Sequence, residues 1–304
     1  MTYHFIINPT AGKGEKQIAL LEQIRETCTQ LNLDYWVHVS EFSEHAIDIA
    51  REICENHAKA RIYACGGDGT LNEVCVGVAA HKHIEVGCLP CGSGNDFIRN
   101  FGDKDFLDIN RQLTSDSQLI DIMNVYDGEK MRHSINAISI GFDSEVAMRM
   151  SQYKHIPFVT GSMSYIISII FSLGKLKGTD IVMDIDGQIV DGKFLLSIIG
   201  NGGFYGGGFN GAPLAKLDDG LMDIVAINDV SILKVPKLIG LYKNGAHREP
   251  DLPEFKNVLN SYKSKKLKIS SKQKLPITVD GEGFYANELE IETIEKVFRF
   301  IVPD

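Results

Sequence analysis

The stretch Arg61-Ile-Tyr-Ala-Cys65-Gly-Gly-Asp-Gly-Thr70-Leu-Asn-Glu73 decides the fold, because a β-prone apolar run passes directly into glycines and then into a helical pattern. Glycines allow main-chain N–H groups to approach an anion closely, and the N-terminus of a helix adds partial positive charge. A strand, a glycine-rich turn and a helix in this order predict a phosphate-binding edge of an α/β sheet.

The segments around this stretch alternate between strand and helix patterns. Compact β-prone runs stand at 3–7, 35–39, 61–65 and 84–89, and apolar residues recur at helical spacing in 15–31, 44–57 and 71–80. Strict alternation with short connections predicts a doubly wound parallel sheet. The sequence therefore predicts an α/β nucleotide domain over residues 1–122.

Two more glycine clusters follow predicted strands of this domain. They are Asn8-Pro-Thr-Ala-Gly12-Lys-Gly14 after the first strand and Pro90-Cys-Gly-Ser-Gly94-Asn-Asp-Phe97 after the fourth. In a parallel sheet all three clusters lie at the carboxyl ends of strands, where open α/β sheets bind ligands. Each loop alone is an ordinary turn, and neither the Walker nor the Rossmann fingerprint is present. Together the three loops predict a nucleotide polyphosphate site.

The pattern changes after residue 121. Strand-like runs stand at 131–140, 180–185, 193–200, 221–227, 266–270 and 275–280, and helical patterns at 165–173 and 230–244. Turns such as Asp186-Gly187 join several of them, which is typical of antiparallel pairing. We expect a mainly antiparallel, β-sandwich-like domain over 123–295. The last run, 296–304, is a strand that is able to return to the first domain.

Composition restricts the function classes. The 304 residues carry 31 Lys and Arg against 40 Asp and Glu, a net charge of −9, which argues against nucleic acid as a partner. Six cysteines without framework spacing indicate a reduced, cytoplasmic protein. Cys88 and Cys91 form a C-x-x-C near His81 and His83, so zinc is an alternative to a simple turn.

No signal peptide is expected at the N-terminus, and the uncharged run 156–173 is shorter than the roughly 20 residues of a membrane span. We expect this run to be a buried helix or, alternatively, a surface that meets an apolar substrate or a bilayer.

The second domain has its own glycine cluster at 200–208, with six glycines in nine residues. We interpret it as a wall of a substrate cleft, with a flexible hairpin as the alternative. The turns Asp218-Asp219-Gly220 and Asp280-Gly281-Glu282 group carboxylates, which suits a hard cation but also fits ordinary β-turns.

Taken in order, these motifs resemble those of bacterial diacylglycerol kinases over essentially the whole chain. The resemblance rests on 8–13, 66–73, 90–97, 217–220 and 280–282. The GGDGT segment alone is shared with NAD kinases and phosphofructokinases, but the joint pattern is specific to lipid kinases. The resemblance implies ATP-dependent transfer of the γ-phosphoryl group to a lipid hydroxyl, most directly diacylglycerol. It also implies an active site between an α/β domain and a β-sandwich-like domain.

Residue roles follow from this resemblance by position. Glu282 stands where the family has its proposed general base, and Asp68 is the other essential acid, close to the catalytic Mg²⁺. A structural Mg²⁺ is implied at Lys216, Asp219 and the Leu221 carbonyl, although Lys216 stands where the family often has an acidic ligand. The implied ATP contacts are Asn8, Pro9, Thr10, Ala11, Gly12, Ser40, Gly66, Gly67, Asp68, Gly69, Thr70, Leu71, Asn72, Ser93, Asn95 and Asp96.

Several alternatives stay open at this point. The acceptor could be a sphingoid base, phosphatidylglycerol or undecaprenol, and a non-catalytic nucleotide-binding regulator is a rival from another class. We expect peripheral contact with the inner face of the membrane through two lysine groups, 263–268 and 154–177. A homodimer is compatible with the sequence.

Overall fold

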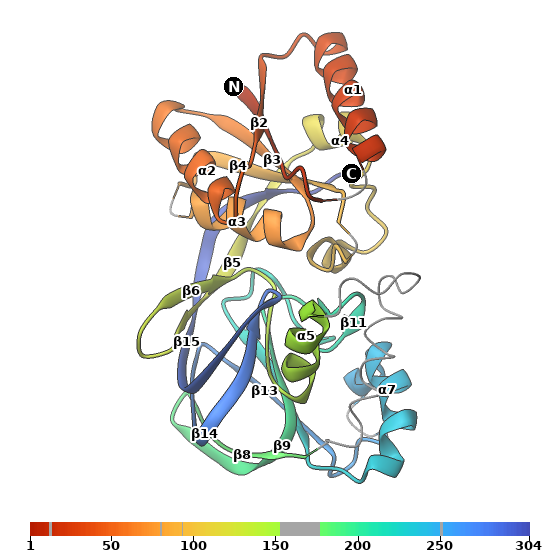
Figure 1. Cartoon of the computed structure of the whole chain (residues 1–304), viewed down its shortest axis with the longest axis vertical. Helices are drawn as coiled ribbons and strands as arrows, with labels where there is room; N and C mark the ends of the chain where they lie inside the picture. Colours follow the sequence, from red (N-terminus) through yellow and green to blue (C-terminus); the bar gives the residue numbers. More distant parts are fainter. Residues whose placement is uncertain (12–13, 80, 93, 153–176, 250–251) are drawn as a thin grey trace. The chain divides into compact units, whose positions relative to one another are not determined.

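The computed structural model describes residues 1–11, 14–79, 81–92, 94–152, 177–249 and 252–304 (Figure 1). The chain divides into two compact units, one of Met1–Ile120 with Lys296–Asp304 and one of Asp121–Glu295. The sequence predicts one domain boundary after residue 122 and another at residue 296. The helix predicted at 165–173 lies outside the described residues. No helix in the described part of the chain is long and apolar enough to cross a membrane.

Unit 1 contains the parallel sheet expected from the alternating pattern. Its strands are β1 (Thr2–Ile7), β2 (Tyr35–Val39), β3 (Ala60–Gly66) and β4 (Ile84–Pro90), together with the end of β15 (Glu282–Ile301). They are ordered β2-β1-β3-β4-β15, and every neighbouring pair is parallel. The carboxyl ends of β1, β3 and β4 therefore lie at one edge.

Helices cover this sheet as the apolar spacing requires. They are α1 (Gly14–Gln30), α2 (His45–Asn56), α3 (Asp68–Val78), the 3₁₀ helix η1 (Phe97–Phe101) and α4 (Ile109–Thr114). Gly77 lies where α3 crosses α2, and a Cβ there would stand 2.7 Å from the Ile47 carbonyl oxygen. The glycine therefore lets the two helices approach closely.

The N-terminus of α2 is stabilised from outside the helix. Glu44 precedes the helix with a φ of 67° and provides no side-chain cap. Instead, the Glu73 carboxylate on α3 accepts hydrogen bonds from the Glu44 and Ala46 N–H groups at 3.1 and 3.3 Å. The last residue of the GGDGTLNE stretch thus satisfies helix N–H groups that would otherwise lack partners.

Unit 2 is an antiparallel β structure, as expected. Along its sheet β13 pairs with β12, β12 with β9, β9 with β7, β7 with β14 and β14 with β15, and β8 pairs with both β9 and β14. The bounds are β7 (Ala137–Gly141), β8 (Thr179–Ile185), β9 (Gln188–Gly200), β12 (Met222–Asn228), β13 (Leu259–Ser264) and β14 (Lys266–Val279).

Further elements complete this unit. They are β5 (Ser117–Tyr126), which begins in unit 1, β6 (Met131–Ser134), α5 (Phe142–Gln152), the hairpin of β10 (Phe204–Tyr205) and β11 (Phe209–Asn210), the 3₁₀ helices η3 (Ile232–Lys234) and η4 (Ala246–Arg248), and α7 (Val235–Lys243). Met123, Ile138, Ile199, Ile224 and Ile277 belong to its main buried apolar cluster.

Several predicted elements differ in extent. The run 131–140 is two strands, because a buried carboxylate binds the N–H groups between them. The runs 266–270 and 275–280 form one strand, with a register shift between Ser270 and Leu275. The predicted strand 296–302 continues without a break from Glu282 and passes Lys296 at a φ of 54°. Among the elements that were not predicted are β5, α4, α5, β13 and the strands β10 and β11.

A histidine cluster covers one end of the parallel sheet. His4 on β1 is 2% exposed, and its Nδ1 lies 3.1 Å from Nε2 of His38 on β2. The His4 ring also stacks on Trp36 and lies 4.7 Å, centroid to centroid, from that of His57. Burial, followed by the charges of His57 and His38, lowers the pKa of His4 to about 4. Burial also lowers the pKa of His38, and the negative charge of Glu52 on α2 opposes part of this shift.

This cluster predicts a loss of stability in weak acid. The unfolded chain binds a proton at His4 below about pH 6.5, whereas the folded chain binds it only near pH 4. Stability therefore falls as the pH decreases through this window, by about 2 kcal/mol between pH 7 and pH 5. His4→Phe keeps a ring against Trp36 and removes this term. Urea unfolding at both pH values should show a smaller pH effect in the variant, and equal pH effects would contradict the assignment.

Candidate active site

Hydrogen bonds join the three glycine loops of unit 1. Asn8 at the end of β1 donates through Nδ2 to Thr70 Oγ1 at 3.1 Å. The Gly66 carbonyl at the end of β3 accepts from the N–H groups of Cys91 and Gly92 at 2.8 and 3.2 Å. Asp68 accepts through Oδ1 from the Phe97 N–H at 3.1 Å. The predicted nucleotide loops are thus one connected edge.

The second and third loops touch through their main chains at Gly67 and Gly92. A Cβ on Gly92 would lie 2.5 Å from the Gly67 Cα, and a Cβ on Gly67 would lie 3.2 Å from the Gly92 Cα. No real side chain tolerates the shorter of these distances. Glycine is therefore required here by close approach, and neither residue needs a left-handed φ.

The first loop is held by its own polar groups. Asn8 Oδ1 accepts from the Thr10 N–H at 3.0 Å and from the Thr10 hydroxyl at 2.7 Å. Gln17 on α1 donates to the Asn8 and Ala11 carbonyls, both at 2.7 Å. Ser40, just after β2, donates its N–H to the Ile7 carbonyl at 2.9 Å. These contacts bring Ser40 beside β1, next to the start of the loop.

The remaining predicted nucleotide contacts differ in exposure. Pro9, Thr10 and Gly69 are exposed, whereas the Leu71 side chain is buried in the core. Asn95 has a φ of 51° and donates through Nδ2 to the Gly92 carbonyl at 3.0 Å. Asp96 forms an ion pair with Arg99 at 3.3 Å. The predicted contacts Gly12 and Ser93 lie outside the described residues.

In unit 2, Glu282 stands at the first position of β15. The β14–β15 hairpin turns through Asp280 and Gly281, at φ 45° and 92°, and Glu282 pairs with Val279. Left-handed conformations at both central residues are typical of tight hairpin turns. The turn leaves the Glu282 side chain exposed at the tip of the hairpin.

The Asp280 carboxylate anchors this turn. It accepts from the N–H groups of Ile135 at 2.8 Å, Asn136 at 3.3 Å and Ala137 at 2.9 Å, and from the Ser134 hydroxyl at 2.8 Å. Burial raises the pKa of Asp280 to about 6, although these four bonds favour the ionised form. Asp280 thereby ties the tip that carries Glu282 to the β6–β7 connection.

Helix α5 lies against the same part of β15. The Tyr285 hydroxyl donates to the Glu145 carboxylate at 2.8 Å. A Cβ on Gly283 would lie 2.3 Å from Met148 Cγ, so the helix packs directly over the strand next to Glu282.

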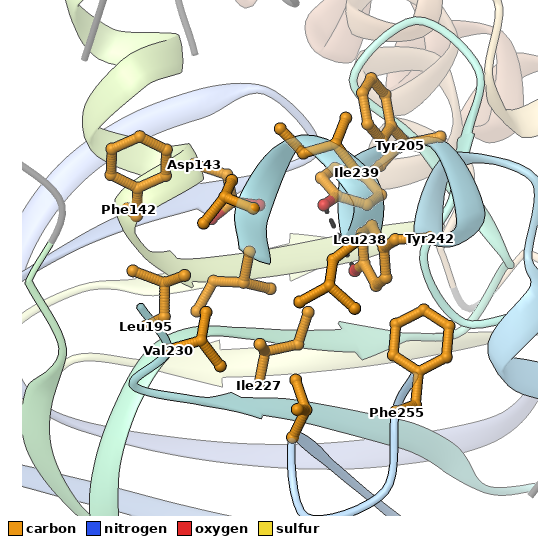
Figure 2. A pocket seen from close by; sticks show the side chains of 14 residues that line it. Phe142, Asp143, Leu195, Tyr205, Ile227, Val230, Leu238, Ile239, Tyr242 and Phe255 are labelled. Carbon is orange, nitrogen blue, oxygen red and sulfur yellow. Dashed lines mark hydrogen bonds between the residues drawn. The ribbon is translucent and has the colours of Figure 1, made fainter. Parts of the chain in front are cut away.

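An apolar pocket lies beside α5, between α7 and strands β9 and β12 (Figure 2). The later part of the glycine cluster 200–208 belongs to the β10–β11 hairpin, and Tyr205 within the cluster and Phe209 just after it line the pocket. The empty space is about 590 Å³, with open solvent at its mouth included.

One carboxylate interrupts the apolar lining. Asp143 is 3% exposed; its Oδ1 accepts from the Ser144 N–H at 2.9 Å, and its Oδ2 meets no hydrogen-bond donor at full hydrogen-bond geometry among the described residues. Burial raises the pKa of Asp143 to about 7, although the Tyr205 hydroxyl and nearby donors lower it. The hydroxyls of Tyr205 and Tyr242 lie 3.4 Å apart in the same pocket (Figure 2). Asp143 was not among the residues predicted from the sequence, where it stands two positions after the buried strand β7.

The Asp-Asp-Gly turn, where a structural Mg²⁺ was expected, is occupied by a lysine side chain. Lys263 Nζ lies 3.2 Å from Asp219 Oδ2 and 2.9 Å from Asp223 Oδ2. Asp219 Oδ1 accepts from the Leu221 N–H at 3.2 Å. Both Asp219 oxygens are thus engaged, and Lys216 contributes a cationic side chain instead of an acidic ligand. These residues fit an ammonium group better than Mg²⁺.

The other lysines of the 263–268 run also have acidic partners. Lys265 pairs with Glu295 at 2.6 Å and Lys268 with Glu290 at 2.7 Å. Lys266 pairs with Glu292 at 3.0 Å. The run therefore carries compensated charge. Of the second lysine group, Lys154 and Lys175 lie outside the described residues.

The zinc alternative gains no support from the geometry. Within the described residues, no three His, Cys, Asp or Glu side chains are grouped as a metal site requires. His83 Nε2 lies 3.4 Å from the Cys54 carbonyl, and the Cys91 thiol lies 3.5 Å from the Leu89 carbonyl.

Comparison with known families matches the two units separately. The family described as "Diacylglycerol kinase catalytic domain" matches residues 2–125. The family described as "YegS C-terminal NAD kinase beta sandwich-like domain" matches residues 136–301.

Individual proteins match nearly the whole chain. "Putative lipid kinase YtlR" of Bacillus subtilis (strain 168) is 28% identical over 92% of this chain and 93% of its own. The "Diacylglycerol kinase" of Staphylococcus carnosus (strain TM300) is 28% identical over 91% and 87%. A crystal structure described as "a putative diacylglycerol kinase from Bacillus anthracis str. Sterne" superposes with a TM-score of 0.77, covering 99% of this chain and 95% of that one at 22% identity. The last likeness concerns the fold.

The contact between the loops predicts opposite effects for two glycines. Gly92→Ala places a Cβ against the Gly67 main chain and should destabilise the protein by about 1–3 kcal/mol, because the loops must separate. Gly69→Ala is the matched control: nothing lies within 4 Å of its added Cβ, and alanine favours the helix by about 0.5–1 kcal/mol. Urea unfolding measures both. Equal stabilities of the two variants would contradict the close approach.

Proposed function

The chain belongs to the lipid kinase family that joins a diacylglycerol kinase catalytic domain to a YegS-type C-terminal domain, and we propose that it transfers the γ-phosphoryl group of ATP to the free hydroxyl of a diacylglycerol. Membership makes it a kinase that acts on a lipid. The identity of the acceptor, the use of Mg²⁺ and the roles of individual residues are parts of the proposal.

The observation that carries the proposal is the connected edge of three glycine loops in unit 1. Phosphoryl transfer depends mainly on positioning the phosphates and on stabilising their charge. The main-chain N–H groups of such loops and the N-terminus of α3 supply donors and partial positive charge for this. Rigid contacts between the loops keep these donors in place.

We assign two acids to the chemical step. Glu282 accepts the proton of the lipid hydroxyl as that oxygen attacks the γ-phosphorus, and ADP leaves with the electrons of the broken P–O bond. Asp68 uses one oxygen on the Phe97 N–H, which leaves its second oxygen for the Mg²⁺ that accompanies ATP. That Mg²⁺ would neutralise charge on the phosphates.

Unit 2 supplies the acceptor side in this proposal. The apolar pocket suits the end of one acyl chain, and its apolar lining favours a lipid over a soluble alcohol. The names of the Staphylococcus relatives favour diacylglycerol over a sphingoid base, phosphatidylglycerol or undecaprenol. We further propose that the enzyme works in the cytoplasm, in peripheral contact with the inner face of the membrane. Because the 263–268 lysines are paired, other surfaces would make that contact.

The role of Glu282 predicts a large loss of turnover without loss of fold. Its side chain is exposed, so Glu282→Gln should keep the unfolding temperature while reducing phosphatidic acid formation by about 10²–10⁴-fold. Labelled product from γ-labelled ATP and diacylglycerol in mixed micelles measures this. Glu288→Gln, another exposed position of β15, is the control and should retain activity. Wild-type rates for Glu282→Gln would exclude it as the base.

Asp143 lowers the stability of the folded chain, and in this proposal it contributes to binding of the lipid acceptor. Its raised pKa means that stability falls as the pH rises from about 4 to about 7, because the unfolded chain ionises Asp143 in this window while the buried carboxyl of the folded chain stays protonated. Asp143→Asn removes this term and should become more stable than wild type by about 2 kcal/mol at pH 5, rising to about 4 kcal/mol near pH 7 and above. We expect a raised KM for the lipid with an unchanged KM for ATP. A raised KM for ATP instead would remove Asp143 from the acceptor site.

A further inference from the structure

The Asp-Asp-Gly turn of unit 2 is built around the ammonium group of Lys263. Asp223 on β12 and Lys263 on β13 are directly opposite in the antiparallel register, so the two side chains leave the sheet on the same face. Asp219 reaches the same ammonium from the turn that precedes β12. Three segments of the unit thereby meet at one positive charge.

The donor count of this ammonium is complete. Lys263 Nζ has three N–H donors, and it has three acceptors: Asp223 Oδ2 at 2.9 Å, Asp219 Oδ2 at 3.2 Å and the Leu214 carbonyl at 3.4 Å. Two carboxylates and a carbonyl are the oxygen ligands that a hard divalent cation would use. The lysine therefore uses the ligand set of a metal ion.

The turn also has an anchor that needs no metal. The Asp121 carboxylate is 0% exposed, and its Oδ2 accepts from the Gly220 N–H at 2.7 Å. The Asp121 N–H donates to the Leu217 carbonyl at 2.7 Å. Asp121 thus anchors the turn on its buried side, and Lys263 contacts it on its solvent-facing side.

The local charge balance disfavours a second cation. Lys263 already pairs with both Asp219 and Asp223, and the charge of Lys216 also acts on Asp223, while the Asp121 carboxylate meets the turn from its buried side. A Mg²⁺ ion would have to displace Lys263 from both carboxylates. It would also stand close to two ammonium groups.

We propose that Lys263 is a built-in cation that replaces the structural Mg²⁺ expected at this turn. The folded state of unit 2 is then independent of divalent metal. The Mg²⁺ demand of the protein is confined to the ion that accompanies ATP. This proposal concerns the fold of unit 2 and does not rest on the identity of the lipid acceptor.

The first test uses the wild-type chain without nucleotide. Its thermal unfolding is compared in EDTA and in millimolar MgCl₂, with NaCl added to equal ionic strength. We expect unfolding temperatures that agree within about 1 °C, since no site gains free energy from the ion. A saturable rise of several degrees on addition of Mg²⁺ would overturn the proposal.

The second test removes the cation. Lys263→Met keeps an unbranched side chain of similar length and leaves Asp219 and Asp223 facing each other without compensation. In EDTA its unfolding temperature should fall by about 5–10 °C, and MgCl₂ should restore part of this loss in a saturable way. Folding only in the presence of Mg²⁺ would be the stronger form of the same result.

The matched control is Lys268→Met, which breaks an exposed pair with Glu290 and should change the unfolding temperature by little in either condition. If Lys263→Met loses no more stability than Lys268→Met in EDTA, the proposal is wrong. If Lys263→Met does not fold in either condition, the wild-type comparison decides alone.

Discussion

Two main chains approach each other at Gly67 and Gly92 more closely than any side chain permits, and the nucleotide edge of unit 1 depends on this contact. The contact fixes the loop after β3 against the loop after β4, and the Gly66 carbonyl closes it with hydrogen bonds to Cys91 and Gly92. Asn8 adds the loop after β1 through Thr70. The parallel sheet brings three strand ends to one edge, but the glycines turn those ends into one rigid surface.

In unit 2, buried carboxylates hold the turns and connections in place. Asp280 binds three N–H groups of the β6–β7 connection, and Asp121 binds the Gly220 N–H of the Asp-Asp-Gly turn. Each carboxylate replaces water at main-chain groups that have no partner in a regular strand. Asp280 therefore ties the exposed hairpin tip that carries Glu282 to the β6–β7 connection. Asp143 differs, because within the described part of the chain its Oδ2 accepts no well-formed hydrogen bond, and an unpaired buried oxygen costs free energy unless a ligand binds it.

Sequence reasoning was accurate where local pattern decides structure. Strand β2 was predicted at its observed residues, and the parallel direction of the strands followed from the alternation of strands and helices. The extents of β14 and β15 were missed, because pairing across the sheet carries both strands through polar stretches that look like breaks. The loops that carry Gly67 and Gly92 were predicted to lie at one edge of the sheet, but the contact between the two glycines was not, since it depends on the path of each loop beyond its strand.

The pocket and the lysine cation could not be predicted for a different reason. Tyr205, Asp143 and Tyr242 are far apart in the sequence, and only the packing of α7 over β9 and β12 brings them together. Lys263 belongs to a lysine run that resembled a membrane-binding patch. Only the β12–β13 register shows that it faces Asp223. A structural Mg²⁺ was expected because the Asp-Asp-Gly turn resembles that of the family. Lys263, which takes its place, lies on the later strand β13.

We propose that this chain phosphorylates a lipid and that diacylglycerol is its acceptor. The most direct measurement offers purified protein with ATP and Mg²⁺ an equimolar mixture of diacylglycerol, phosphatidylglycerol, a sphingoid base and undecaprenol, and identifies the products by mass spectrometry. The account predicts phosphatidic acid as the dominant product. Dominance of another phosphorylated lipid would contradict the choice of acceptor, and ATP bound without any phosphorylated lipid would contradict the assignment as a kinase.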